Sequence, residues 1–276
     1  MRQPTVAVAS SVWRQQGTTA GERIIPEETA IAFTYDGGSY AVMMATPQNL
    51  EDFALGFSFT EGLIASPADI RQLDILEHDA GIELRMWLTE PRAAALGERR
   101  RYLAGPTGCG LCGIDSLDEA VRTPRRLRDG GAFTPAEIMR ALEALPPRQE
   151  LNRQTRAVHA AAFWRPGAGL LAVREDVGRH NALDKLAGAL LREGVSGEDG
   201  MVVLTSRVSV EMVQKTAAIG APLLVAVSAP TALALRTAQT AGLTLVAVAR
   251  GDGFEIFTHP SRVGKGNNKE TVPNVA

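Results

Sequence analysis

Two cysteines, Cys109 and Cys112, are the residues of this sequence best suited to chemistry. They are the only cysteines among 276 residues, and they lie in the stretch Thr107-Gly108-Cys109-Gly110-Leu111-Cys112-Gly113. Two thiols at this spacing can close a disulfide, share a metal ion, or act as nucleophile and resolving partner. The glycines leave the sulfur atoms uncovered and let the loop change conformation. We therefore predict a mobile loop that carries reactive thiols.

Two alternatives for this pair are weakened by its surroundings. A structural zinc site usually takes four ligands, and one Cys-x-x-Cys supplies two of them. A third would have to come from one of four histidines: His78, His159, His180 or His259. A thioredoxin-like motif opens a helix directly after the first strand of a compact fold, whereas this pair lies well along the chain. We predict no metal, and sulfur or redox chemistry is the remaining interpretation.

A second dense cluster is Glu175-Asp176-Val177-Gly178-Arg179-His180-Asn181, which is followed by Asp184 and Lys185. It stands between an expected strand and an expected helix. For Arg179, His180 and Asn181 we predict contact with a ligand or partner. For Asp184 and Lys185 we favour ordinary charge pairs along the helix.

Two arginines, Arg207 and Arg250, each follow an expected strand. An arginine there is suited to phosphate, since its guanidinium donates two parallel hydrogen bonds, and Gly251 and Gly253 let backbone amides approach an anion. The alternative for each is a surface salt bridge. Gly-x-Gly-x-x-Gly and Walker motifs are absent from the sequence, so a nucleotide site would be of another kind.

The elements that position these residues differ between the two halves of the chain. In the first half, apolar runs around turn residues predict hairpins over 30–45 and 73–88. Thr-Pro pairs predict helices that begin at Thr46 and Thr134, each threonine being the N-cap. Residues 91–105 look like a polar connector, and only a short strand near Val12 is indicated before residue 26.

In the second half, strands and helices alternate three times, which is typical of parallel strands covered by helices. We predict an α/β fold whose ligand site lies at the carboxyl ends of the strands. The predicted organisation is an α+β region over 1–150 with the cysteine loop, an α/β cofactor-binding domain over 151–262, and a disordered tail over 263–276.

The overall composition excludes several classes of protein. Hydrophobic residues make up 45% and charged residues 22% of the chain, as in ordinary globular proteins. A formal net charge of -2 gives no electrostatic case for nucleic-acid binding. No apolar run approaches the roughly 20 residues of a membrane span. The first residues lack the apolar core of a signal peptide, so we expect a cytoplasmic protein.

Several motifs together resemble those of the FdhD family of formate dehydrogenase accessory sulfurtransferases. Besides the cysteine loop and the cluster at 175–181, the matching pieces run from residue 27 almost to the end of the chain. They are Glu27-Glu28-Thr29, Thr46-Pro47, Gly56-Phe57, Glu61-Gly62, His159-Ala160-Ala161, Asp184-Lys185, Ser206-Arg207, Glu211-Met212-Val213, Lys215, Ser228-Ala229-Pro230-Thr231 and Thr258-His259-Pro260. Two departures are Arg156 and Ser206, which stand where the family usually has glycine.

The resemblance implies a three-layer, cytidine-deaminase-like fold in a homodimer. It implies a sulfur carrier that accepts sulfur from a cysteine desulfurase and passes it to the molybdenum cofactor, bis-molybdopterin guanine dinucleotide, before insertion into formate dehydrogenase. The cofactor is then a bound substrate rather than a permanent group. Cys109 and Cys112 would be catalytic, with Cys109 the main persulfide carrier. The cofactor would contact His180, Arg207, Val248, Ala249, Arg250, Gly251, Asp252 and Gly253.

Two other functions compete with the sulfur carrier as interpretations of the sequence. Zinc deaminases use His-x-Glu followed downstream by Pro-Cys-x-x-Cys. Here the cysteines precede His159, and Ala161 stands where the proton-shuttling glutamate belongs, so deaminase activity is rejected. The remaining alternative is a chaperone that binds and delivers the cofactor without transferring sulfur.

Overall fold

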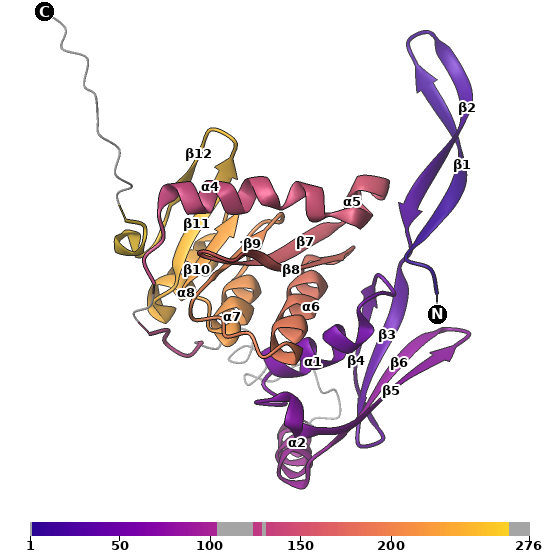
Figure 1. The fold of residues 1–276 in the computed structure, drawn as a ribbon. Helices are drawn as coiled ribbons and strands as arrows, with labels where there is room; N and C mark the ends of the chain where they lie inside the picture. The colour runs from indigo at the N-terminus through magenta and orange to yellow at the C-terminus, as the bar shows by residue number, and fades with distance from the viewer. Residues whose placement is uncertain (1, 104–123, 129–130, 265–276) are drawn as a thin grey trace, which may run out of the picture.

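The computed structural model describes residues 2–103, 124–128 and 131–264 (Figure 1). Its centre is a six-stranded sheet in the order β12-β11-β10-β9-β7-β8. The three middle strands β9, β10 and β11 are parallel, while β7, β8 and β12 join antiparallel to their neighbours. The strands are β7 His159–Arg165, β8 Gly169–Asp176, β9 Met201–Leu204, β10 Leu223–Ala226, β11 Thr244–Arg250 and β12 Gly253–Ile256.

Helices cover both faces of this sheet. On one face lie α6 Arg179–Arg192, α7 Val210–Ile219 and α8 Ala232–Ala241, which bury one set of alternating strand side chains. On the other lie α4 Pro135–Ala144 and α5 Glu150–Thr155 (Figure 1). This is the predicted three-layer α/β architecture. The strand–helix alternation correctly predicted the parallel strands β9, β10 and β11, while β7, β8 and β12 pair antiparallel with their neighbours.

A second sheet lies in the first part of the chain, in the order β4-β3-β6-β5. Both predicted hairpins are confirmed. The strands are β3 Thr29–Tyr35, β4 Gly38–Ala45, β5 Ile70–His78 and β6 Gly81–Leu88. The apolar face of α1, Leu50–Thr60, packs on this sheet, and the Phe33 ring lies 5.0 Å from that of Phe53 and 4.1 Å from that of Phe57, between centroids.

The two halves of the molecule meet where α1 crosses α6. Gly56 of α1 and Gly188 of α6 lie at the crossing. A β-carbon on Gly56 would collide with the Asp184 carbonyl oxygen, and one on Gly188 with the carbonyl oxygen of Asp52. Because glycine has no side chain, the two backbones can touch at this point.

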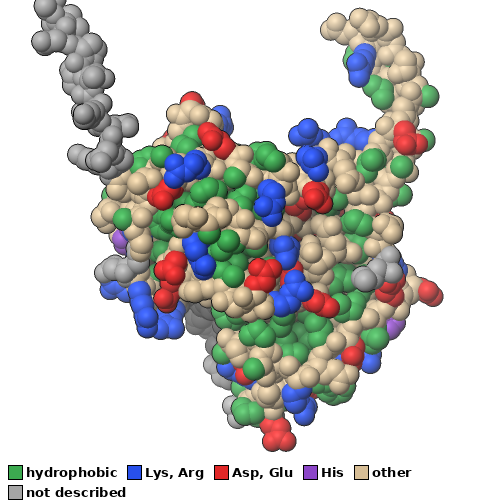
Figure 2. Space-filling view, in the orientation of Figure 1, with side chains coloured by type: hydrophobic (Ala, Val, Ile, Leu, Met, Phe, Trp, Pro, Cys, Tyr) green, Lys and Arg blue, Asp and Glu red, His purple; other side chains and the backbone are tan. Residues whose placement is uncertain are grey.

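A long two-stranded ribbon precedes the second sheet. It consists of β1 Thr5–Arg14 and β2 Gly17–Pro26, paired antiparallel along their whole length. The tip of the ribbon projects away from the rest of the molecule in Figures 1 and 2, and Trp13 near the tip is 73% exposed. The base of the ribbon lies beside α5, where the Arg23 guanidinium donates to Thr155 O at 3.4 Å. The short strand predicted near Val12 is therefore only a small part of the ribbon that the structure shows. A ribbon exposed on both faces has no alternation of apolar and polar residues to reveal it.

The helix predicted from Thr46 starts later than expected. Helix α1 begins at Leu50, and its N-cap is Asn49 in the left-handed conformation, with φ 53°. Thr46 is instead buried among residues of the other half of the chain. Its N–H donates to Asp176 at 3.0 Å, and its hydroxyl accepts from the Val177 N–H at 3.2 Å. This tertiary contact takes the place of a helix cap.

The predicted polar connector is also wrong over most of its length, because α2 occupies Glu90–Leu103. Leu96 is buried and Ala93 packs beside it against the four-stranded sheet. Because α2 has few large apolar residues, its helical periodicity is weak. By contrast, α4 was correctly predicted: the Thr134 hydroxyl accepts from the Glu137 N–H at 3.2 Å, and the Glu137 carboxylate accepts from the Thr134 N–H at 2.8 Å.

The second half also contains pieces from outside the predicted 151–262 segment. Ile138 and Ala141 of α4 share the core of the six-stranded sheet, and Val263 bridges to Phe133. Ordered structure thus extends to residue 264, and the division at 150 stays a prediction.

No helix among the described residues has the length and apolar character needed to cross a membrane.

Candidate functional site

The carboxyl ends of four strands meet at one edge of the six-stranded sheet. Strand β8 runs in the same direction as β9, because each is antiparallel to β7 between them. The loop after β9 is joined to the loop after β10, since the Val208 N–H donates to Ala229 O at 3.2 Å, and that loop is joined to the end of β11, since the Val248 N–H donates to Ser228 O at 3.3 Å. We call this the carboxyl edge, and it is where ligands bind in open α/β sheets.

His180 lies at this edge, in the first turn of α6, and is held by α7. Its Nε2 is 2.8 Å from a carboxylate oxygen of Glu211, which also accepts from the Ser209 hydroxyl at 3.1 Å. Burial lowers the pKa of His180 below its ordinary value, and the Glu211 carboxylate opposes that effect. Burial acts to raise the pKa of Glu211, but the interactions with His180 and Ser209 outweigh burial and lower that pKa. The pair therefore joins an imidazole that resists protonation to a carboxylate that stays ionised.

His159 begins β7 directly opposite the last residue of β8, Asp176. Burial lowers the pKa of His159, and the positive charge of Arg179 adds to the effect. The Nε atom of Arg179 is buried without a hydrogen-bond partner among the described atoms. His159, Arg179 and His180 thus form a neighbouring set of nitrogen groups. His159 was not among the predicted cofactor contacts, because nothing in the spacing of the sequence joins it to the 175–181 cluster.

The buried side of the 175–181 cluster is organised by Asp176. One of its carboxylate oxygens accepts from the Gly178 N–H at 2.8 Å and from the Asn181 amide at 3.0 Å. The other accepts from Lys185 at 2.6 Å, within an ion pair whose two side chains are 0% exposed. Asn181 is itself buried, so the structure gives it a role in shaping the turn before α6 rather than the predicted ligand contact.

Asp184 and Lys185 are likewise not the surface helical pairs that the spacing suggested. The Asp184 carboxylate accepts from Lys215 of α7 at 2.8 Å and from the Thr60 hydroxyl of α1 at 2.6 Å. Burial would lower the pKa of Lys215, but the Asp184 and Glu61 carboxylates outweigh it and raise that pKa. Glu175 has a structural role too, since its carboxylate accepts from the Leu151 and Asn152 N–H groups at the start of α5.

The predicted cofactor contacts at 248–253 span the last three residues of β11, the two-residue turn at 251–252 and the first residue of β12. Val248 has φ 53°, a left-handed conformation that is strained for a β-branched residue. The Ala249 side chain is buried in the core, whereas Arg250, Gly251 and Asp252 are exposed. Strain of this kind persists where the surrounding structure enforces it, and it clusters at ligand-binding sites.

The predicted site residues lie along one edge rather than around one point. His180 follows β8 and Arg250 ends β11, and these strands are four inter-strand steps apart, about 19 Å. Arg207, which is exposed, follows β9 between them. Glu211 is the residue that the predicted set lacked, because its partner His180 comes from a different helix and spacing alone does not join them.

The predicted catalytic residues, Cys109 and Cys112, lie outside the described residues. The described chain resumes at Pro124. The geometry above therefore concerns the candidate cofactor site, and the thiol chemistry remains a prediction from the sequence.

Comparison with known proteins gives a single consistent family. Residues 26–264 match the model of the FdhD/NarQ family. The chain is 53% identical over 257 residues to the sulfur carrier protein FdhD of Agrobacterium fabrum, covering 93% of this chain and 95% of that protein. It is 47% identical over 255 residues to the protein of the same name from Cupriavidus necator, covering 92% and 88%.

A solved structure agrees with these sequence matches. The crystal structure of a candidate formate dehydrogenase accessory protein from Desulfotalea psychrophila superposes with a TM-score of 0.75 at 27% identity, covering 95% of this chain and all of that one. The resemblance seen in the motifs is thereby confirmed. The chain belongs to the FdhD/NarQ family.

Proposed function

We propose that this chain is a sulfur carrier that takes part in the maturation of formate dehydrogenase in the cytoplasm. The observation that carries the proposal is the Cys109-Gly110-Leu111-Cys112 motif in a chain 53% identical to a named sulfur carrier protein. The name of the related solved structure supports the link to formate dehydrogenase.

The chemistry of loading is thiol exchange. The thiolate of Cys109 attacks the outer sulfur of a persulfide on a cysteine desulfurase, forming a new S–S bond as the donor's S–S bond breaks. The donor leaves as a cysteine thiolate, and this chain keeps the sulfur as a persulfide. Cys112 then receives the sulfur, or expels it as sulfide by forming a disulfide with Cys109.

The acceptor is the molybdenum cofactor in its bis-molybdopterin guanine dinucleotide form, bound as a substrate at the carboxyl edge. Three features support this. Arg207 and Arg250 are exposed there and suit phosphate groups. The backbone at Val248 is strained. The span of about 19 Å from His180 to Arg250 fits an extended dinucleotide better than a small ligand.

Mass spectrometry of the protein after incubation with a cysteine desulfurase and L-cysteine tests the proposal. We expect an adduct of one sulfur atom on the peptide that holds Cys109 and Cys112. The Cys109→Ala/Cys112→Ala double variant serves as the control and should show none. A wild-type protein that gains no sulfur, or a double variant that gains as much, would refute the sulfur-carrier proposal.

The same variants separate the carrier from a chaperone that only binds and delivers the cofactor. The residues of the carboxyl edge suited to phosphate, Arg207 and Arg250, come from outside the cysteine loop, and this observation supports the second candidate. A chaperone predicts that Cys→Ala variants still support formate dehydrogenase activity in cells, while Arg250→Ala does not and binds guanine nucleotide more weakly. The carrier predicts that both kinds of variant fail.

A further inference from the structure

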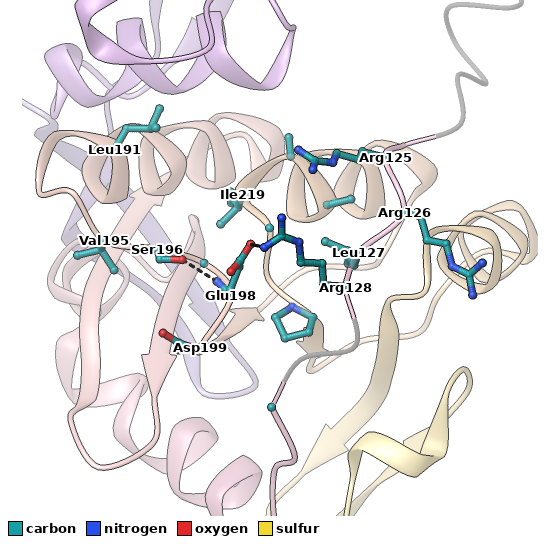
Figure 3. A pocket seen from close by; sticks show the side chains of 16 residues that line it. Arg125, Arg126, Leu127, Arg128, Leu191, Val195, Ser196, Glu198, Asp199 and Ile219 are labelled. Carbon is teal, nitrogen blue, oxygen red and sulfur yellow. Dashed lines mark hydrogen bonds and ion pairs between the residues drawn. The ribbon is translucent and has the colours of Figure 1, made fainter.

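A pocket of about 500 Å³ opens at the sheet edge opposite the candidate site, beside the amino ends of β9 and β10 (Figure 3). One wall is the loop between α6 and β9, which includes Val195 and Glu198, and another is the end of α7 at Ile219. The remaining wall is the short segment 125–128. The pocket therefore combines an apolar floor with a charged rim.

The segment 125–128 is fixed to the molecule by its backbone. The Leu127 N–H donates to Ala241 O at 2.8 Å, and the Leu127 side chain packs against the core of the six-stranded sheet. Arg262, which is buried, donates to Arg128 O at 3.2 Å and to Gly242 O at 2.7 Å. These contacts therefore fix the backbone positions from which the arginine side chains of this segment project.

These side chains form a basic strip, Arg125, Arg126 and Arg128, all exposed. Arg128 extends across the pocket toward Glu198, and Arg126 points away from it (Figure 3). The closest Arg128–Glu198 approach is 4.0 Å, between side chains that are 79% and 61% exposed. An exposed pair at this distance contributes little, so another carboxylate can displace Glu198. Guanidinium groups around an apolar floor suit an acidic peptide segment that carries an apolar side chain.

We propose that the basic strip and its pocket are the docking surface for an acidic segment of the sulfur-donor protein, an inference that rests on the proposed function. The strip begins within 13 residues of Cys112, which an extended chain spans in at most about 45 Å. A donor held on the strip is thus confined to the region that the chain allows Cys112 to reach, and this confinement raises its effective concentration there. Arginine charge also steers an acidic partner during encounter.

The experiment compares two sulfur sources on the full-length protein. Sulfur loading of the cysteine peptide is timed with a purified cysteine desulfurase plus L-cysteine, and separately with inorganic polysulfide, which needs no docking. We expect Arg125→Glu/Arg128→Glu to slow loading from the desulfurase about tenfold and to leave loading from polysulfide unchanged. Arg125→Gln/Arg128→Gln should give a smaller loss, and added salt should slow the wild type more than either variant.

The matched control is Arg153→Glu/Arg236→Glu, which reverses two exposed arginines elsewhere and should load at the wild-type rate. Equal loading of the strip variant and the wild type from the desulfurase would overturn the docking surface alone. Slow loading of the strip variant from both sources, or a changed oligomeric state, would also overturn it, since the strip would then act on the thiols or between copies of the chain. If the desulfurase fails to load even the wild type, the proposed function falls and the docking surface with it.

Discussion

The residues at the carboxyl edge form two groups. One group lies at the surface of the edge, and the other is buried and stabilises the turn before α6. His180 and Glu211 face the edge, 2.8 Å apart. Asp176 holds it from below, because its two carboxylate oxygens accept from the turn before α6, from Thr46 and from Lys185. Each group permits a separate test, one by titration and one by stability.

The first prediction concerns the charge state of His180. Glu211→Gln removes the negative charge that opposes the effect of burial, so the pKa of His180 should fall further below its ordinary value. Imidazole resonances followed by NMR against pH measure this directly. Glu255→Gln, a change at an exposed carboxylate on β12, is the control and should leave the titration in place. An unchanged or rising midpoint in Glu211→Gln would contradict the assigned pair.

The second prediction concerns the buried ion pair. Lys185→Met keeps the shape of the side chain but leaves the Asp176 carboxylate buried without its cation, which should lower the free energy of unfolding by about 3–5 kcal/mol. Urea denaturation measures it. Asp176→Asn added to Lys185→Met should recover part of the loss, because no uncompensated charge remains. Arg236→Met on the exposed face of α8 should change stability by no more than about 0.5 kcal/mol. A loss that small for Lys185→Met would show that the pair is not buried in solution.

At the scale of elements, the helix crossing of α1 and α6 is the joint between the two sheets. Its close approach depends on Gly56 and Gly188, and the Asp184–Lys215 and Asp176–Lys185 pairs lie around it. Such a joint tolerates very little added volume, since the atoms that a new methyl group would meet belong to the backbone.

Gly188→Ala tests this joint. The added methyl group would collide with the backbone of Asp52, so α1 must move away from α6, and we expect a loss of at least about 1–3 kcal/mol in urea denaturation. Gly264→Ala is the control, because a β-carbon there meets nothing within 4 Å. Equal stability of the two variants would mean that the helices are not in backbone contact.

Elements with a one-sided burial pattern could be predicted from the sequence, and the others could not. The hairpins at 29–45 and 70–88 and the helix capped by Thr134 follow local rules of turns and caps. The ribbon β1–β2 has no buried face, and α2 has few large apolar residues to mark its period. The exposed part of the site, Arg207 and Arg250, was predictable from its place after strands. The partners of Asp176 and His180 were not, because they come from elements far away in the sequence.

For the whole molecule, the outer part of the ribbon β1–β2 is the feature that the rest of the described chain leaves uncovered. An isolated two-stranded ribbon is marginally stable in water, and this one exposes Trp13 at 73% and Val6 and Ile24 at about 40%. We propose that a second copy of the chain covers it, in the homodimer that the family resemblance implies. Exposed apolar and aromatic side chains of this kind commonly form the centre of protein interfaces.

The dimer prediction is tested by light scattering over a range of concentrations. Wild-type protein should show twice the mass of one chain, and Trp13→Ser should raise the dimer dissociation constant at least about tenfold. Ile256→Ser, which alters an exposed apolar residue on β12 instead, should leave the constant unchanged. A monomeric wild type, or a Trp13→Ser protein that associates as tightly, would rule out the ribbon as the dimer contact.

The crossing of α1 and α6 also limits which relatives can be combined into a folded chimaera. Residues 46, 52, 56 and 60 touch residues 176, 174, 188 and 184 through hydrogen bonds, ion pairs and close backbone approach. In a chimaera that joins the first 150 residues of one relative to the remainder of another, the residues on the two sides of this contact come from different parent proteins. Such hybrids should fold when both parents carry the same residues at these eight positions. They should not fold when the parents differ at one of these positions, because the hybrid then pairs residues that do not fit each other. The overall sequence identity of the parents should not change this outcome.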